Sequence, residues 1–138
     1  MSVEKDNIVL AEKMYEYGWA SDWPRLESLL TEDFEIVEAA SFSFGGTYRG
    51  KKALQEVFGK VLGVLQPKDV RRKSMMANES EVISLLELVF DDPDGEFVMP
   101  VAEYFEMRDG QIARMIPYFL DTTAMNDYLA RRDKASST

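Results

Sequence analysis

The sequence contains no histidine and no cysteine. This absence excludes thiolate nucleophiles, Ser-His relays, the usual zinc sites and disulfides. Any acid, base or electrophile must therefore come from aspartate, glutamate, tyrosine, lysine or arginine. We expect no metal and no cofactor, and carboxylates in apolar strands become the residues to look for.

Long apolar runs are also missing. No run approaches the roughly 20 residues of a membrane span, and the segment Met1–Asp6 lacks the basic start and apolar core of a signal peptide. Basic residues are few, since 16 lysines and arginines stand against 25 acidic residues, for a formal net charge of −9. Such a charge argues against a nucleic acid or an anionic membrane as the main partner. We therefore expect a cytoplasmic protein with no membrane and no nucleic-acid partner.

Length and composition indicate one domain. A hydrophobic content of 46% over 138 residues describes a globular protein, large enough to bury about two-thirds of its unfolded surface. We expect a single domain over residues 1–138, in which residues 134–138 form a disordered tail.

Hydrophobic periodicity predicts helices in the first half of the chain and strands in the second. A wide apolar stripe indicates a helix from about Asp6 to Ser21. Asp22 followed by Pro24 is typical of the cap and first turn of a second helix, which we expect to end at Asp33. The other expected elements are a hairpin over 34–50, a helix over 51–65, strands over 70–77, 81–91, 97–108 and 111–120, and a short helix over 121–132. Together they predict an α+β domain with a cavity between helices and sheet.

Four segments carry a resemblance to a known family. They are Asp22-Trp23, the run from Gly46 to Leu54, the run from Val101 to Ile112, and Tyr118-Phe-Leu-Asp-Thr122. In their order and spacing the chain resembles, from about residue 8 to residue 125, the SnoaL-like and ketosteroid isomerase-like branch of the nuclear transport factor 2-like superfamily. The resemblance implies a cone-shaped α+β fold in which three helices from the N-terminal half pack on a strongly curved antiparallel sheet.

The resemblance implies several candidate functions, because this fold is shared by cyclases, isomerases, epoxide hydrolases, dehydratases and non-catalytic binding modules. In ketosteroid isomerases a general-base Asp follows a Val-Glu pair, and that position is Ala39 here. Their oxyanion-hole Asp maps onto Glu103, and their oxyanion-hole Tyr onto Met14. In SnoaL-like cyclases and limonene epoxide hydrolases an acid ends the last strand, and here that acid is Asp121, one residue late. Ketosteroid isomerase activity itself is therefore not expected.

The late position of Asp121 can be tested against strand geometry. A regular hairpin with a two-residue turn at Asp109-Gly110 leaves Asp121 pointing away from the face that carries Glu103. One extra residue in the last strand reverses this, and Pro117 favours such a bulge because it cannot donate to the sheet ladder. We therefore predict a bulge at or next to Pro117, with Asp121 on the inner face.

Three carboxylates are candidate catalytic residues, and each has a simpler structural interpretation. Asp121 would be the acid/base, or only the N-cap of the last helix. Glu103 would be its electrostatic or proton-donating partner, or only the salt-bridge partner of Arg114. Glu38 would be a substitute base, or only an exposed acid at the end of a strand. An apolar cone would raise the pKa values of these carboxyls, and one of them could then act as a general acid near neutral pH.

Apolar and aromatic side chains are numerous enough to line a pocket for a ring-containing or terpenoid ligand, although most of the aromatic residues belong to the core. We take Met14, Trp19, Phe58 and Tyr118 as candidate substrate contacts. Tyr17 is the candidate hydrogen-bond donor, because it shares a helical stripe with Met14 and its phenol could reach a substrate oxygen.

The leading hypothesis is a cofactor-free enzyme that performs acid/base isomerisation, cyclisation, dehydration or epoxide hydrolysis on a hydrophobic small molecule. The alternative is a non-catalytic ligand-binding or dimerisation module of the same fold. We also expect a homodimer through the outer face of the sheet, since strand 81–91 is apolar on both faces and three helices cannot cover every strand. An enclosed cavity with a carboxyl of raised pKa favours the enzyme, and a Glu103–Arg114 salt bridge with little cavity favours the module.

Overall fold

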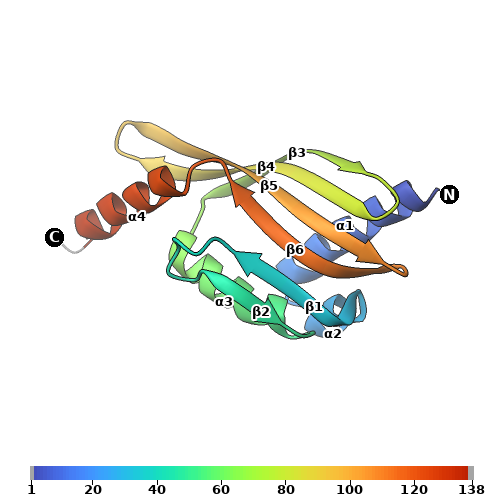
Figure 1. Cartoon of the computed structure of the whole chain (residues 1–138). Coiled ribbons are helices and arrows are strands. Elements are labelled where there is room, and N and C mark those ends of the chain that lie inside the picture. The colour runs from blue at the N-terminus through green and yellow to red at the C-terminus, as the bar shows by residue number, and fades with distance from the viewer. Residues whose placement is uncertain (1, 137–138) are drawn as a thin grey trace.

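The computed structural model describes residues 2–136 of the chain (Figure 1). Over these residues the elements are α1 (Val3–Trp19), α2 (Trp23–Ser28), β1 (Leu30–Glu38), β2 (Gly46–Arg49), α3 (Ala53–Leu65), β3 (Asp69–Ala77), β4 (Glu81–Asp92), β5 (Gly95–Arg108), β6 (Gln111–Phe119) and α4 (Thr122–Ser136). The predicted α+β class is confirmed, and each predicted helix and strand is present with shifted ends.

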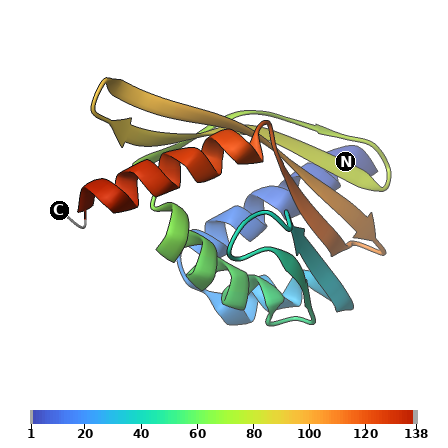
Figure 2. The same ribbon diagram turned by 60° about the vertical axis from the view of Figure 1, so that its left-hand side comes forward.

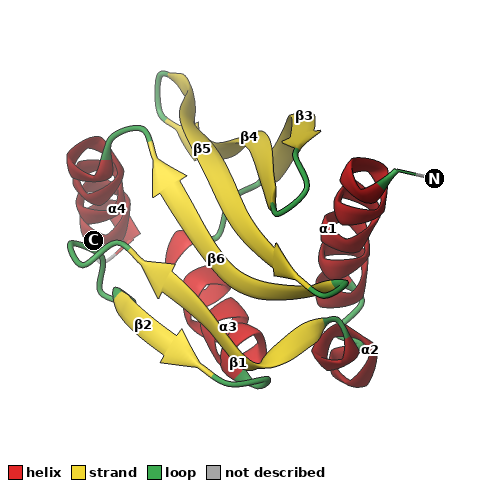
Figure 3. Ribbon diagram, turned by 45° about the vertical axis from the view of Figure 1, so that its right-hand side comes forward, coloured by secondary structure: helices red, strands yellow, loops and turns green. Residues whose placement is uncertain are grey.

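The strands form one curved sheet in the order β2-β1-β6-β5-β4-β3 (Figure 3). Its neighbours pair antiparallel except β1 and β6, which run parallel. The predicted curved antiparallel sheet is therefore confirmed, with β1 and β6 as a parallel pair that the prediction did not include. Parallel neighbours need a long connection between them, and here the whole segment from β2 to β5 separates β1 from β6.

The N-terminal helices begin where local capping chemistry allows. Ser2 caps α1 by accepting a hydrogen bond from the backbone N–H of Lys5, and Asp22 caps α2 in the same way, as predicted. The second helix ends at Ser28 instead of Asp33, because Leu30 already pairs with Ile112 of β6. Sheet pairing thus shortens a helix that its local sequence would have allowed to continue.

The three long helices lie against the concave side of the sheet (Figure 2). Two clusters of buried side chains fill the space between them. One cluster joins α1 and α2 to β1 and β5, around Phe34 and Phe105, and the other joins α4 to β4, around Phe90. Helix α3 contributes to both, with Leu54 in the first cluster and Leu65 in the second. The space where the clusters meet holds the site described below.

The last helix is longer than predicted. It runs to Ser136, so residues 134–136 of the expected tail are helical, while residues 137–138 lie outside the described part of the chain. Tyr128 stacks on Phe97 of β5 with ring centroids 4.8 Å apart, and Met125 is fully buried. This packing fixes the helix against the sheet, where polar sequence alone suggested fraying.

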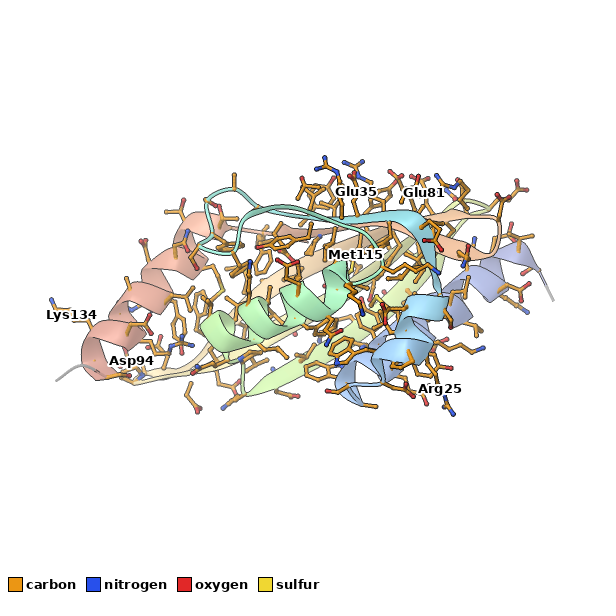
Figure 4. All side chains as sticks on the ribbon, turned by 90° about the horizontal axis from the view of Figure 1, so that it is seen from below. Arg25, Glu35, Glu81, Asp94, Met115 and Lys134 are labelled. Atoms are coloured by element: carbon orange, nitrogen blue, oxygen red, sulfur yellow. The ribbon has the colours of Figure 1, made fainter. Side chains whose placement is uncertain are left out.

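Strand β6 contains a bulge, but the prediction that it lies at or next to Pro117 is wrong. The register between β5 and β6 shifts after the Met107–Ile112 pair, so Ala113 is the extra residue and the ladder past Pro117 is regular. Beyond the bulge Glu103 lies opposite Pro117. The shift turns Met115 toward the core, where Figure 4 shows its side chain between the sheet and α3.

None of the helices in residues 2–136 is long and apolar enough to cross a membrane. The cytoplasmic location expected from the sequence stays a prediction.

Candidate functional site

A cavity of about 120 Å³ lies between the concave face of the sheet and helices α1 and α3. Most of its lining is apolar and comes from both clusters, including Met14, Phe58, Leu86, Val101 and Met115. An apolar pocket with a few converging polar groups is the usual form of a small-molecule site. Its polar groups therefore decide what it can do.

Two carboxyl groups reach this cavity from the sheet. Along β1 the buried positions alternate as Phe34, Ile36 and Glu38, which places Glu38 on the inner face with only 5% of its surface exposed. Glu103 follows the same parity on β5, between the buried Val101 and Phe105. Strand alternation thus brings both acids to the same apolar space, as predicted for Glu103 and as one of two alternatives for Glu38.

Tyr15 of α1 is a third polar group in the cavity, beside the two carboxyls. Its hydroxyl donates a short hydrogen bond to Oε1 of Glu103. The ring is held edge-on against Phe105, with centroids 6.0 Å apart, and it lies one turn from the buried Ala11 on the same face of the helix. A packed ring and a fixed acceptor leave the phenol little freedom to turn.

Burial dominates the electrostatics of these three groups. It raises the pKa of Glu38 to about 8, and the nearby charge of Glu103 adds to the effect. Burial also raises the pKa of Glu103, opposed by the hydrogen bond from Tyr15 and the charge of Arg72. The pKa of Tyr15 is raised as well, first by burial and then by Glu103, so this phenol stays a donor. At neutral pH Glu38 is therefore mostly protonated beside a second acid.

Arg72 of β3 reaches the cavity from its open side. Its guanidinium carbon lies 4.1 Å from the centroid of the Tyr15 ring, in the geometry of a cation–π contact. Among residues 2–136 no group of three or more aspartates and glutamates is arranged to hold a metal ion. The ionisable and hydroxyl-bearing groups that line the cavity are thus two carboxyls, one phenol and one guanidinium.

The alternative interpretation of Glu103, as the salt-bridge partner of Arg114, is wrong. Arg114 lies on the outer face, with Nε 2.9 Å from Glu35 and Nη1 3.4 Å from Glu106. Figure 4 shows Glu35 on the side of the sheet that turns away from α3. The extra residue Ala113 next to Arg114 explains the error, because a regular hairpin would have kept Arg114 on the face of Glu103.

Asp121 is the N-cap of α4, which was the simpler of its two interpretations. Its Oδ1 accepts a hydrogen bond from the backbone N–H of Ala124 at 2.9 Å, at the start of α4. The residue is exposed and is not part of the cavity lining. The structure thus separates Asp121 from Glu38 and Glu103, which it brings together.

Of the five candidate substrate contacts, three line the cavity and two do not. Met14, Trp19 and Phe58 line the cavity. Tyr17 does not, and its ring instead faces Arg25, whose guanidinium carbon is 6.0 Å from the centroid. Tyr118 points to the outer face with 55% of its surface exposed.

Sequence reasoning missed Tyr15 and Arg72. A signal for Tyr15 was present, because it follows Ala11 by four residues on an apolar stripe. Arg72 gave no signal of this kind, because it stands in a run of basic residues that is typical of a solvated strand edge. Only the tertiary structure brings that edge over α1.

The sequence profile of the SnoaL-like domain family matches residues 11–115. The chain belongs to the SnoaL-like domain family. The matched segment includes Tyr15, Glu38, Arg72 and Glu103, hence every polar group assigned to the cavity above. The resemblance to this branch of the superfamily, inferred from four segments of sequence, is therefore confirmed.

Solved structures agree with this SnoaL-like fold. Bal32a, from a soil-derived mobile gene cassette, has a TM-score of 0.77 and 15% identity, covering 93% of this chain and 99% of its own. TerC co-crystallised with polyporic acid has a TM-score of 0.74 and 22% identity, covering 91% and 98%. A candidate SnoaL-like polyketide cyclase from Jannaschia sp. CCS1 has a TM-score of 0.72 and 14% identity, covering 91% and 92%. No curated protein matches the sequence.

Two positions mapped from ketosteroid isomerases lie next to polar residues of the cavity. Ala39, the mapped base position, is not part of the cavity lining, whereas the preceding residue Glu38 is. Met14, onto which the oxyanion-hole tyrosine was mapped, lines the cavity, and so does the next residue, Tyr15. Consecutive side chains point in different directions along a strand or a helix.

Proposed function

We propose that this SnoaL-like protein is a cofactor-free enzyme that transfers protons on a hydrophobic substrate containing a carbonyl group. The observation that supports it most is the burial of Glu38 and Glu103 in one apolar cavity, with raised pKa values and, among residues 2–136, no lysine or arginine nitrogen within 4.0 Å of either carboxylate. Isomerisation and cyclisation through an enolate use these groups most directly. Structural carboxylates are seldom kept at this cost, since burying an unpaired acid destabilises a fold.

Glu38 is the proton-transfer group in this proposal. Its ionised form removes a proton from a carbon next to the carbonyl, and the electron pair of that C–H bond moves to the carbonyl oxygen. The protonated Glu38 then returns the proton to another carbon of the enolate. In a ring closure the enolate carbon instead attacks a second carbonyl, whose π electrons move to its oxygen, and Glu38 gives its proton to the resulting alkoxide. A pKa of about 8 keeps both forms accessible near neutral pH.

Tyr15 and Glu103 are the oxygen-binding groups. The Tyr15 hydroxyl is buried and held by its contact with Glu103, and a protonated Glu103 is a second donor. Donors fixed before the reaction stabilise a developing oxyanion more than water does, because they need no reorientation. The rate should therefore depend on all three residues, with Glu38 contributing most.

A hydrogen-exchange experiment tests the proposal. The protein is incubated in D₂O with hydrophobic ketones such as 1-tetralone, and deuterium uptake next to the carbonyl is followed by mass spectrometry. We expect wild type to accelerate uptake, and Glu38→Gln to lower the rate by about 10² to 10⁴-fold. Glu35→Gln is the matched control, because Glu35 is on the same strand but on its outer face.

The outcomes separate the two candidate functions. An exchange rate that increases with pH up to about 8 is expected from the pKa of Glu38, since the ionised form is the base. Uptake that is the same with wild type and with Glu38→Gln, or no acceleration with any ketone, would contradict the enzyme. The non-catalytic ligand-binding module would then be the better description. Polyporic acid, bound by TerC, is a suitable first binding probe for that case.

We also propose that the protein is a homodimer through the outer face of its sheet. That face exposes large apolar side chains, among them Ile83 at 39%, Leu85 at 37% and Tyr118 at 55%. Sedimentation equilibrium should give twice the mass of one chain, and Leu85→Glu should give the single-chain mass. A single-chain mass for wild type at micromolar concentration would contradict the proposal.

A further inference from the structure

Arg72 differs from every other arginine of this chain. Each of the others has a carboxylate oxygen within 4.0 Å of a guanidinium nitrogen. Among the described residues no carboxylate is that close to Arg72, although its charge still lowers the pKa of Glu103, and its guanidinium carbon lies 4.1 Å from the centroid of the Tyr15 ring. In a protein with a net charge of −9, an arginine without a salt bridge is an exception.

Arg72 lies at the opening of the cavity. Within residues 2–136 it is the one basic residue that lines the cavity, and it also lines a shallow depression just outside it. Trp19, Leu62 and Pro67 likewise line both, so the two spaces are continuous at this edge. Lys68 also borders the depression, but its ammonium lies 3.0 Å and 2.8 Å from two acidic side chains. Arg72 therefore supplies the available positive charge at the mouth.

The contact with Tyr15 leaves the hydrogen-bonding edge of Arg72 available. A guanidinium that stacks on a ring uses its flat face, while its five N–H groups point outward in the plane. Two parallel N–H groups match the two oxygens of a carboxylate. The aromatic ring fixes the plane of the fork, so less freedom is lost when an anion binds.

We propose that Arg72 binds an anionic oxygen group of the ligand, so that the ligand of this site is an amphipathic anion with its apolar body in the cavity and its carboxylate at the mouth. The inference deepens the proposed function, on which it rests, by naming the class of substrate. Glu38 and Glu103 then face the apolar end of the ligand, and Arg72 sets which end enters first.

Matched acids and amides test the charge requirement directly. We would titrate the protein with 2-naphthoate and biphenyl-4-carboxylate, and with the corresponding neutral amides, using calorimetry and backbone NMR shifts to locate the binding site. Each amide retains the shape of its acid but carries no charge. We expect each acid to bind at least about tenfold more tightly than its amide, because a hydrogen bond to a charged group is worth about 1.5 to 3 kcal/mol.

Variants at Arg72 assign that preference to one side chain. Arg72→Gln should abolish the preference for the acid, and Arg72→Lys should retain part of it, because lysine has the charge but not the planar fork. Arg71→Gln is the matched control, since Arg71 is the preceding residue and pairs with Asp69 and Glu96 outside the cavity. Its acid preference should equal that of wild type. Arg72 is exposed on a sheet edge, so its variants should still fold, with melting temperatures lowered only by the lost contact with Tyr15.

Three results would overturn the inference: equal affinities for acid and amide, a preference that survives Arg72→Gln, or no binding of either acid in the cavity. Glu38→Gln separates this inference from the proposed function, because it should lose deuterium exchange and retain the preference for acids. If no ketone is exchanged but Arg72 still selects acids, the enzyme proposal fails and the anion site stands.

Discussion

Strands β1 and β5 each carry glutamates on both faces of the sheet. On one face these glutamates form ion pairs, and on the other they are buried without one. On the outer face Glu35 and Glu106 share Arg114, at 2.9 Å and 3.4 Å. On the inner face Glu38 and Glu103 have no lysine or arginine nitrogen within 4.0 Å among the described residues, and the pKa of each is raised by burial. The face on which a glutamate lies, not its residue type, separates an ion-paired carboxylate from a buried carboxyl of raised pKa.

The two faces also contain comparable tyrosine–glutamate pairs. Tyr15 donates to Glu103 inside the cavity, and Tyr104 donates to Glu81 on the outer face at 2.5 Å. Figure 4 shows Glu81 on the same face of the sheet as Glu35, turned away from α3. Water can replace the outer contact when it breaks, but it cannot reach the inner contact so easily. Matched substitutions on the two faces therefore measure how much burial changes the contribution of such a contact to the free energy of unfolding.

The largest expected effect is the dependence of stability on pH at Glu38. Its pKa is raised by folding from 4.5 to about 8, so stability is fully retained below pH 4.5 and is lost as pH rises to 8, by up to about 5 kcal/mol. Glu38→Gln removes this loss. Urea unfolding should be measured at several pH values. The free energy of unfolding of the variant, relative to that of wild type, should increase between pH 5 and 8 and stay constant at higher pH.

Glu35→Gln provides the outer-face control for that titration. Its difference from wild type should change little between pH 6 and 9, because Glu35 is partly exposed and forms a salt bridge with Arg114 on the outer face. If the Glu38→Gln and wild-type curves run parallel over the whole range, Glu38 is not buried as the structure shows.

Tyr15→Phe should have the next largest effect. It leaves Glu103 without its donor, so the pKa of Glu103 rises further and the free energy of unfolding falls by about 1 to 3 kcal/mol. Tyr104→Phe should cost clearly less, because Glu81 lies at the surface. Equal losses for the two variants, measured by urea unfolding, would remove the distinction between the faces.

Asp121→Ala should lower the free energy of unfolding by about 1 kcal/mol through the loss of the α4 cap. Asp121→Asn should cost little, since the amide oxygen still accepts the hydrogen bond. Both variants should exchange deuterium at the wild-type rate. A loss of exchange with normal stability would return Asp121 to the list of catalytic candidates.

The smallest effect is expected for Glu106→Gln, which breaks one outer ion pair of Arg114. Partly exposed pairs contribute between about 0 and 1 kcal/mol, and salt screens them. Unfolding at low and high ionic strength should show a small cost that shrinks with salt. A cost as large as that of Tyr15→Phe would contradict the view that solvent weakens the outer face.

Much of the fold was predictable because its signals are local. Turn residues such as Asp109-Gly110 separate the strands, and Asp22 caps the second helix as its sequence predicts. The inward position of Glu38 follows from the regular alternation between Phe34 and Glu38 in the second half of β1. The family could be inferred from the order of these elements, since the matched profile covers residues 11–115.

Other features depended on contacts between distant segments. The bulge at Ala113 reverses the parity of β6 and turns Arg114 outward, although the sequence pointed to Pro117. A bulge is a property of two paired strands, so the residue that forms it is chosen by the partner as much as by its own chain. The end of α2 and the length of α4 were likewise decided by the sheet.

What the sequence determined by itself was the set of chemical groups: with no histidine and no cysteine, only carboxyls, phenols and basic side chains were available for chemistry. The tertiary structure decided which of them meet. Tyr15 and Tyr17 are two residues apart on α1, about 200° around the helix, and only the docking of α1 puts Tyr15 in the cavity. Arg72 reaches it because β3 curves over that helix. Local periodicity names the faces of an element, and only packing against other elements decides which face is buried.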